Sequence, residues 1–380
     1  MTLCLLFCHS RTCNFLSVRT IKFDHKANPE FIKVLRKRVN TYFKEKEISK
    51  HANFNMKFKT GFMLALYFVP YAFMLTPLVE TVWMFLLLWA IMGIGQAGIG
   101  LSIMHDANHG AYSKSPRVNK IVGYCLNLVG GSAANWKMQH NVLHHSFTNI
   151  DGMDEDIAPL GIMRFSPHQK RRKIHKAQYI YAWFFYALMN VSWILQKDFT
   201  QLVRYDKMGL VKGQRSTLKK MMTELIISKT LFYTYVVVVP ILVTDFAWYW
   251  VIAGLFIVLL VSGFILACIF QPAHVMPTSE YPLPDETGNI ENDWAVLQLA
   301  TTTNFAPKAK LFSWFVGGLN FQIEHHLFPN ICHVHYKQLS KIVKKTADEF
   351  NLPYNVQPTF AHALIEHGKM LHTLGRKDLV

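Results

Sequence analysis

Four long stretches of this chain are almost free of charge, and they restrict its fold more than any other feature. They cover residues 60–78, 82–104, 225–244 and 246–270, and the only charged residue inside them is Lys229. An α-helix needs about 20 apolar residues to cross a bilayer, and backbone polar groups in lipid must be satisfied internally. The sequence therefore predicts an all-α integral membrane protein with four transmembrane helices arranged as two hairpins.

The charges of the connecting segments predict the orientation of these helices. The two tight loops between paired stretches hold Glu80 and Asp245 and no lysine or arginine. Basic clusters lie in the other segments, at 36–38, 170–173, 219–220 and 341–345. Because lysine and arginine concentrate on the cytoplasmic side of a span, we expect a multi-pass protein with a helical cap and its catalytic face on the cytoplasmic side.

Residues 178–195 complicate this topology. The stretch is long enough for a fifth span, but a crossing would place the basic loop 197–220 on the opposite side from 164–176. It would also separate histidine motifs that need to meet. Its tryptophan and tyrosine content is typical of the membrane interface, so we expect an interfacial or re-entrant segment.

The composition excludes several classes of protein. Forty lysines and arginines face 24 acidic residues, giving a net charge of +16, which suits nucleic acid or an anionic membrane surface. The apolar stretches favour the membrane, and we expect no nucleic-acid partner. Six scattered cysteines form no CxxC pair, so neither a disulfide framework nor a zinc knuckle is expected.

Two histidine clusters follow apolar segments. The first, HDANH, holds His105 and His109, and the second, HNVLHH, holds His140, His144 and His145. Residues i and i+4 share a helix face, so His105 pairs with His109 and His140 with His144. His145 lies about 100° further round the helix. Neighbouring histidines of the second cluster can therefore bind two different metals.

A third cluster, QIEHH, holds Gln322, His325 and His326, and Gln322 can join the face of the two histidines. A lone histidine, His274, follows the fourth apolar stretch; by itself such a residue is usually structural. The predicted topology places all of these motifs on the cytoplasmic side, just beyond the span ends.

Eight histidines and one glutamine are enough ligands for two metals. Imidazole suits iron, zinc, copper and nickel, so the ligand type leaves the metal open. A metal-dependent lipid hydrolase would need about three ligands per zinc, and a metal carrier would place its ligands near the bilayer midplane. Both are less favoured alternatives, because the donors are too many and lie beyond the spans.

The ordered motifs HDANH, HNVLHH and QIEHH, together with two hydrophobic hairpins, resemble the membrane fatty acid desaturase family from about residue 21 to residue 360. Gln322, in place of the first histidine of the third motif, resembles the front-end, linoleoyl-CoA desaturase-like branch. Those enzymes insert a double bond between an existing one and the carboxyl end, in a delta-5 or delta-6 manner. The resemblance implies two non-haem irons, O₂ as co-substrate, and His274 as an additional ligand.

The resemblance also implies the partners of the protein. The substrate would be an unsaturated fatty acyl chain carried by CoA or by a lipid. The 380 residues contain no HPGG haem motif of a fused cytochrome b5 domain, so we expect a separate electron donor, either ferredoxin or cytochrome b5 with its reductase. A fatty acyl hydroxylase of the same di-iron class stays open as an alternative, as do the acyl carrier, the chain length and the double-bond position.

Four segments are expected along the chain. Residues 1–20 would be a disordered extension or an upstream mis-start, 21–58 a basic cytoplasmic helical region, 59–360 the desaturase domain, and 361–380 a C-terminal tail.

Polar residues near the motifs are candidates for supporting roles, because metal-bound histidines donate their other N–H to an oxygen acceptor. The candidates for this support are Asp106, Asn108, Asp154, Asp156, Asn320 and Glu324. We expect a narrow apolar tunnel for the acyl chain, and the candidates to line it are Trp294, Gln298, Thr301 and Asn304.

Overall fold

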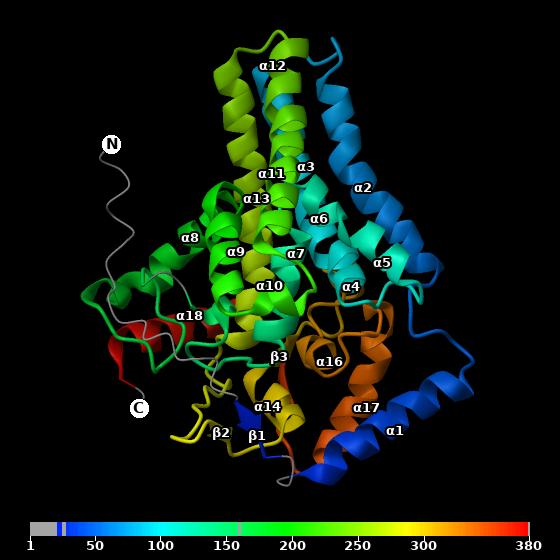
Figure 1. The fold of residues 1–380 in the computed structure, drawn as a ribbon, viewed down its shortest axis with the longest axis vertical. Helices are drawn as coiled ribbons and strands as arrows, with labels where there is room; N and C mark the ends of the chain where they lie inside the picture. The colour runs from blue at the N-terminus through cyan, green and yellow to red at the C-terminus, as the bar shows by residue number, and fades with distance from the viewer. Residues whose placement is uncertain (1–20, 25–27, 159–160, 379–380) are drawn as a thin grey trace.

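The computed structural model describes residues 21–24, 28–158 and 161–378. The expected extension at 1–20 lies outside the described residues. Long helices stand side by side along the long axis of the molecule, and a cap of shorter helices covers one end of them (Figure 1). This arrangement matches the predicted helical bundle with a helical cap.

Four helical columns form the bundle. They begin with α2 (Phe54–Met74), α3 (Val82–Gly98), α11 (Leu218–Tyr233) and α13 (Trp248–His274). Two columns are longer than these helices, because η1 (Ile99–Met104) and α4 (His105–Asn108) extend α3, and η6 (Thr234–Val238) and α12 (Val239–Val243) extend α11. The two tight turns that contain Glu80 and Asp245 meet at the top of Figure 1, away from the cap.

Three of the four predicted spans are confirmed as long apolar helices. Val82–Asn108, Leu218–Val243 and Trp248–His274 are each long and apolar enough to cross a membrane. The fourth helix, α2, begins at Phe54, contains Lys57 and Lys59, and ends at Met74. These lysines shorten its apolar part, so the crossing of α2 stays a prediction.

Close approach between the long helices depends on glycine. A Cβ atom on Gly95 of α3 would lie 2.7 Å from the backbone nitrogen of Tyr67 on α2. A Cβ on Gly254 of α13 would lie 2.3 Å from the indole of Trp89. Small residues at helix contacts let backbones pack closely where lipid supplies no hydrophobic driving force. Glycine at these two positions therefore lets α2 and α13 pack closely against α3.

The segment 178–195 forms α8 (Gln178–Ser192) and the start of η5 (Trp193–Lys197), which continues into α9 (Asp198–Lys207). In Figure 1, α8 runs obliquely up to the side of the bundle and ends well below the tight turns at the top. It packs on α13, where the Asn190 side-chain amide donates to the Ser262 hydroxyl at 2.8 Å. Its interfacial placement stays a prediction.

Two small parallel strand pairs depart from the all-α prediction. Strand β1 (Lys22–Phe23) pairs with β2 (Asn289–Ile290), and β3 (Thr303–Phe305) pairs with β4 (Asn355–Gln357). Thr303 is in register with Asn355. The second pair ties the segment after α14 (Trp294–Thr301) to the one before α18 (Phe360–Arg376). Strands this short carry too little periodic pattern to be predicted from sequence.

The remaining helices build the cap and the flanks of the bundle. They are α1 (Pro29–Glu45), α5 (Pro116–Gly123), α6 (Cys125–Leu128), α7 (Ala133–Trp136), η2 (Lys137–His144), η3 (Glu155–Ile157), η4 (Lys173–Ala177), α10 (Leu210–Gly213), α14 (Trp294–Thr301), α15 (Lys310–Phe315), α16 (Gln322–Leu327), η7 (His333–His335), α17 (Tyr336–Glu349) and α18 (Phe360–Arg376).

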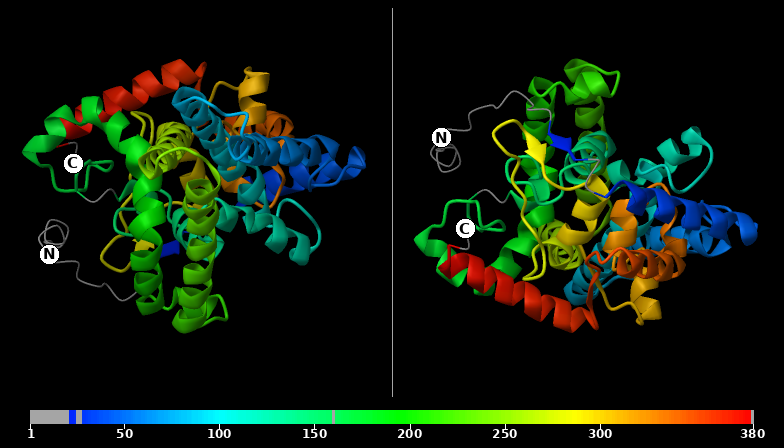
Figure 2. Two further views of the ribbon diagram at one scale, coloured as in Figure 1. Left: turned by 90° about the horizontal axis from the view of Figure 1, so that it is seen from above. Right: turned by 90° about the horizontal axis from the view of Figure 1, so that it is seen from below.

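The two ends of the described chain lie on different sides of the bundle, with α1 on one side and α18 on the other (Figure 2). Helix α1 packs on α17, where the rings of Phe31 and Phe350 meet edge to face at 5.7 Å. Helix α18 occupies most of the segment expected as a tail, and it is anchored by a 2.6 Å contact between the Tyr186 hydroxyl and His367 Nε2.

Candidate metal centre

Eight histidines meet at the junction of the bundle and the cap. Four elements deliver them, namely the helical column that extends α3, the η2 region, the last residue of α13, and α16. Seven of them are buried and His109 is half-buried: the buried ones are His105, His140, His144, His145, His274, His325 and His326. The structure therefore brings together every histidine that the sequence singled out.

The histidines fall into two clusters. We call His105, His109, His140 and His325 cluster one, and His144, His274 and His326 cluster two. Within each cluster one ligand atom of every residue lies within 4.8 Å of those of the others. His145 groups with His325 and His326 by the same criterion, so it lies between the clusters.

A π-helical turn sets the directions of the second motif. The backbone N–H of His145 donates to the His140 carbonyl at 3.0 Å, five residues back, and His145 Nε2 lies 3.2 Å from His140 Nε2. The ring of His144 lies 4.7 Å from that of His274. The α-helical spacing predicted that His140 pairs with His144; their rings are stacked at 5.1 Å and both group with Asp156. The wider π turn brings His145 next to His140 as well.

Several buried ring nitrogens lack a partner. Among the described residues, none hydrogen-bonds to either nitrogen of His105, to Nδ1 of His145, or to Nε2 of His109, His274 and His326. A buried polar atom without a partner is costly, and imidazole nitrogen is a good ligand for transition metals. The donor set therefore fits metal ions.

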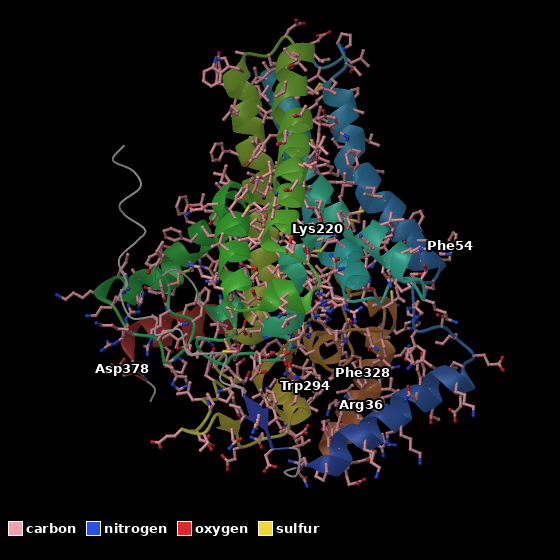
Figure 3. The ribbon with its side chains drawn as sticks, in the orientation of Figure 1. Arg36, Phe54, Lys220, Trp294, Phe328 and Asp378 are labelled. Carbon is pink, nitrogen blue, oxygen red and sulfur yellow. The ribbon has the colours of Figure 1, made fainter. Side chains whose placement is uncertain are left out.

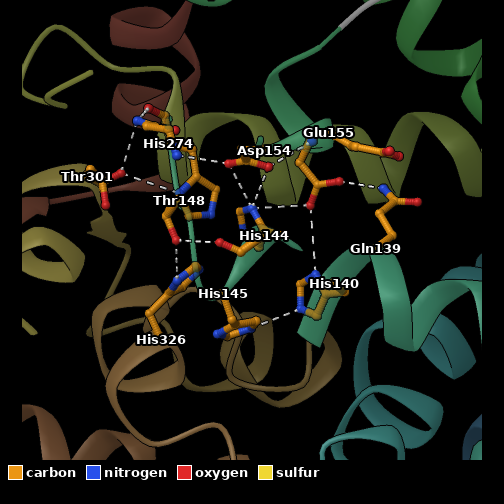
Figure 4. A network of polar contacts seen from close by, with 12 residues as sticks. Gln139, His140, His144, His145, Thr148, Asp154, Glu155, His274, Thr301 and His326 are labelled. Atoms are coloured by element: carbon orange, nitrogen blue, oxygen red, sulfur yellow. Dashed lines mark hydrogen bonds and ion pairs between the residues drawn. The ribbon is translucent and has the colours of Figure 1, made fainter. Parts of the chain in front are cut away.

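Cluster two is supported by oxygen atoms behind its rings (Figure 4). His144 Nδ1 lies 3.1 Å from both oxygens of Asp154, and Asp154 also accepts the backbone N–H groups of Asn149 and Asp156 at 2.9 Å. Burial disfavours a charged ring, but the charges of Asp154 and Asp156 outweigh it and raise the pKa of His144 to about 9.

The other two rings of cluster two have similar contacts. His326 Nδ1 lies 2.8 Å from the side-chain oxygen of Gln298, which also accepts the Thr148 hydroxyl at 2.9 Å. His274 Nδ1 lies 3.4 Å from the Thr301 backbone carbonyl. Each ring thus has an acceptor that can fix its orientation.

Cluster one has weaker support. His325 Nδ1 lies 3.2 Å from the Tyr336 hydroxyl, whereas His105 Nδ1 is 3.8 Å from Asp106 and His140 Nδ1 is 3.8 Å from a carboxylate oxygen of Asp156. Distances of 3.8 Å exceed those of hydrogen bonds. Burial, together with the charges of nearby histidines, lowers the pKa of His325 well below its usual value.

A buried chain of three polar residues reaches cluster one from α2, and the sequence analysis missed two of them. The Lys59 ammonium lies 2.7 Å from His333 Nε2, and His333 Nδ1 lies 2.9 Å from Asp106. The backbone N–H of His333 donates to the same carboxylate at 3.1 Å. Asp106 therefore interacts mainly with His333, next to His105. The sequence signal was a charged residue at the start of an apolar stretch, where lysine is costly unless it is used.

The residues expected to line the acyl path instead contact the histidine segments, and their role in substrate binding stays a prediction. The Trp294 indole donates to the His145 carbonyl at 3.0 Å, while Gln298 and Thr301 support cluster two as described. Asn304 donates to Glu324 at 2.8 Å and accepts the Ile323 backbone N–H at 2.9 Å.

The remaining predicted support residues lie close by but contact no ring of the clusters. Burial raises the pKa of Glu324 to about 7, and Tyr354 and Asn304 donate to its carboxylate. Asn320 donates to the Phe305 carbonyl at 3.0 Å, which holds a loop.

Two predicted amide side chains keep an unpartnered atom. Asn108 is weakly bound to the Gly123 carbonyl at 3.4 Å, and its side-chain oxygen has no partner among the described residues. Gln322 is buried at the start of α16, and its amide nitrogen also has no partner among the described residues.

Comparison with known proteins identifies the family of this chain. A model described as "Fatty acid desaturase" matches residues 81–358. The sn-1 linoleoyl-lipid 6-desaturase of Synechocystis sp. is 36% identical, over 95% of this chain and 99% of its own length. The acyl-lipid (8-3)-desaturase of Physcomitrium patens is 37% identical, over 94% of this chain and 74% of its own.

A third relative, Delta(5) fatty acid desaturase A of Dictyostelium discoideum, is 30% identical over 93% of this chain and 76% of its own length. The resemblance drawn from the histidine motifs is thereby confirmed: the chain belongs to the fatty acid desaturase family, whose members are oxidoreductases.

Proposed function

We propose that this protein is a front-end desaturase that inserts a cis double bond into an unsaturated fatty acyl chain, between an existing double bond and the carboxyl end. The observation that carries the proposal is the convergence of eight histidines at the bundle end, seven of them in two adjoining clusters and His145 between the clusters. The three relatives described above are named as 6-, (8-3)- and delta-5 desaturases, which supports the regiochemistry.

Two non-haem irons would occupy the clusters. The first would be held by His105, His109, His140 and His325 together with His145, and the second by His144, His274 and His326. Two nitrogens at adjacent positions on one metal lie about 3 Å apart, and His145 Nε2 lies 2.9 Å from His325 Nε2. Gln322 would complete the second set, because it is buried one turn before His326 and its amide nitrogen is unpartnered.

When bound, the irons supply the O₂-dependent oxidation that removes two hydrogens from neighbouring methylene carbons. The task of the protein is to hold and position the reacting groups. Asp154, Gln298 and the Thr301 carbonyl orient the rings of cluster two. The buried surroundings keep bulk water away from the site, which limits side reactions of a strong oxidant.

The catalytic face would be cytoplasmic and the protein multi-pass. The two turns at the far end of the bundle carry Glu80 and Asp245 without a lysine or arginine, and this charge bias supports the orientation. Electrons would come from a separate ferredoxin, or from cytochrome b5 with its reductase, and O₂ would be the co-substrate. A basic face suits an acidic donor protein.

Expression in a host of known fatty acid profile tests the proposal. Cells would receive linoleate or α-linolenate, and total fatty acids would be analysed by gas chromatography with mass spectrometry, beside a His325→Ala/His326→Ala control. We expect a product with an additional cis double bond toward the carboxyl end, absent from the control. A hydroxylated product would replace the proposal by a hydroxylase, and no product despite iron loading and supplied donors would overturn it.

A further inference from the structure

A pocket of about 920 Å³ beside the first histidine motif is lined by many cations and one carboxylate, Glu224. The cations are Lys114, Lys120, Lys137, Arg215 and Lys220. None of the five forms an ion pair with the described residues, and Glu224 itself accepts the Tyr124 hydroxyl at 2.6 Å. The pocket therefore carries an excess of positive charge, five cations against the single carboxylate of Glu224, whose charge acts on Lys137.

The inner wall of this pocket is part of the metal site. Ala107 and Asn108 line it, and both lie between His105 and His109 in the sequence. Asn108 is only 6% exposed, and its side-chain oxygen has no partner among the described residues. Lys137, another lining residue, precedes His140 by three residues in η2. A ligand in the pocket would thus be bound next to cluster one.

The pocket also lies where the surface becomes apolar. Ile121 on α5 is 72% exposed, and Ile227 on α11 is 56% exposed. Lys220 stands near the start of the span Leu218–Val243, and Figure 3 shows it well above Trp294 of the cap. Cations beside exposed apolar side chains, at the end of a spanning helix, are typical of the lipid headgroup layer.

The cations crowd one another. Burial, and next to it the charge of Lys120, lowers the pKa of Lys137. Like charges in a half-buried wall repel each other, and a bound anion would relieve that repulsion. Phosphate is the anion that several lysines and an arginine recognise through charge-assisted hydrogen bonds.

We propose that this pocket binds a phosphate group of the acyl carrier and thereby fixes the distance from the carboxyl end of the chain to the metals. The inference rests on the proposed function, because a front-end double bond is counted from the carboxyl end. To place the double bond a fixed number of carbons from the carboxyl group, the enzyme must hold the polar end of the substrate at a fixed, short distance from the metals. A pocket lined by Ala107 and Asn108 lies close enough to the metal site to do so. The phosphate is either the phosphodiester of a glycerophospholipid or a phosphate of the diphosphate bridge of CoA.

The test uses the full-length, iron-loaded protein in vesicles with supplied electron donors. Linoleoyl chains are offered on phosphatidylglycerol, on a neutral galactolipid and on CoA. The test variant is Lys120→Gln/Arg215→Gln. The matched control, Arg36→Gln/Lys37→Gln, removes two charges from a different basic pocket, on α1, that contains no residue of the histidine motifs.

We expect the test variant to raise the KM for a phosphate-bearing carrier by about tenfold or more, with little change in kcat. The galactolipid and the control variant should show no change, and Lys120→Arg/Arg215→Lys should restore the low KM. In products of the test variant, the new double bond should also appear at neighbouring positions of the chain. An effect confined to phosphatidylglycerol identifies a phospholipid as the source of the phosphate, and an effect confined to linoleoyl-CoA identifies CoA.

Equal KM values for wild type and test variant on every carrier would overturn the inference while leaving the desaturase intact, as would an equal rise for the galactolipid. Native mass spectrometry of the same proteins with phosphatidylglycerol measures bound lipid without turnover. A wild type that makes no product, yet retains the lipid through Lys120 and Arg215, would contradict the proposed function and support the phosphate pocket.

Discussion

The two histidine clusters adjoin each other but differ in what holds their rings. In cluster two, the Nδ1 atoms of His144, His274 and His326 all lie within 3.4 Å of an oxygen atom. In cluster one, the carboxylates beside His105 and His140 are 3.8 Å away. Second-sphere acceptors fix ring orientation and raise ligand basicity. Cluster two is therefore preorganised, whereas the rings of cluster one are freer to adjust.

The largest expected effect is shared by both clusters. Replacing His140 of cluster one or His274 of cluster two by alanine should reduce product to background, because the oxidation needs both metals. The measurements are product analysis by gas chromatography and the iron content of the purified protein. Either variant retaining more than about a tenth of wild-type activity would show that one cluster is dispensable, against the two-metal account.

Loss of the hydrogen-bond partner behind a ring should affect cluster two more than cluster one. Asp154→Asn, behind His144, should lower iron affinity or activity by about 10- to 100-fold, the usual cost of losing such a partner. Tyr336→Phe, behind His325, should cost less than about fivefold, because that contact is a single neutral hydrogen bond. Iron titration with activity measured at each step compares them. A larger loss for Tyr336→Phe would reverse the assignment of the preorganised cluster.

The rate of iron removal should also differ between the two clusters. A chelator added to the iron-loaded protein should remove the metals in two phases, with cluster one losing its metal first. Gln298→Ala, which deletes the acceptor of His326, should speed the slow phase by about tenfold and leave the fast phase unchanged. Absorbance of the chelator–iron complex follows both phases. A single phase for wild type would mean that the clusters hold metal equally.

The smallest effect concerns the chain that reaches cluster one from α2. Lys59→Met removes the buried partner of His333 Nε2 and leaves the contact of Nδ1 with Asp106 intact, which should lower the free energy of unfolding by about 1–3 kcal/mol. Activity should fall only a few-fold. Lys57→Met, on an exposed neighbour in the same helix, is the matched control. Thermal unfolding in detergent compares the two, and equal stability of both variants would show that the Lys59–His333 contact contributes nothing.

Hydropathy and the order of the histidine motifs predicted most of the long apolar helices and the family. Three of the four predicted stretches form helices long and apolar enough to cross a membrane, and the family is confirmed by comparison, because uncharged stretches of about twenty residues have few alternatives to a membrane helix. Helix α2 was harder to predict, since Lys59 is buried against His333 by tertiary contacts that no hydropathy value contains.

The finer geometry of the site needed the fold. Helical spacing predicts every histidine that shares a face only if the helix is regular, and the π turn adds His145 to the neighbours of His140. The partners of the rings were equally hidden, because Gln298 and Thr301 come from a segment more than 150 residues after the second motif. Their contacts with His326 and His274 depend on how α14 packs in the cap.

The measurement that tests the two-metal site most directly is the iron stoichiometry of the purified, fully active protein. Anaerobic reconstitution with ⁵⁷Fe, followed by metal analysis and Mössbauer spectroscopy, counts the irons and distinguishes their surroundings. The account predicts two irons per chain in distinguishable, nitrogen-rich environments, with activity rising only as the second site fills. A fully active protein with one metal ion per chain, or with zinc in both clusters, would contradict it.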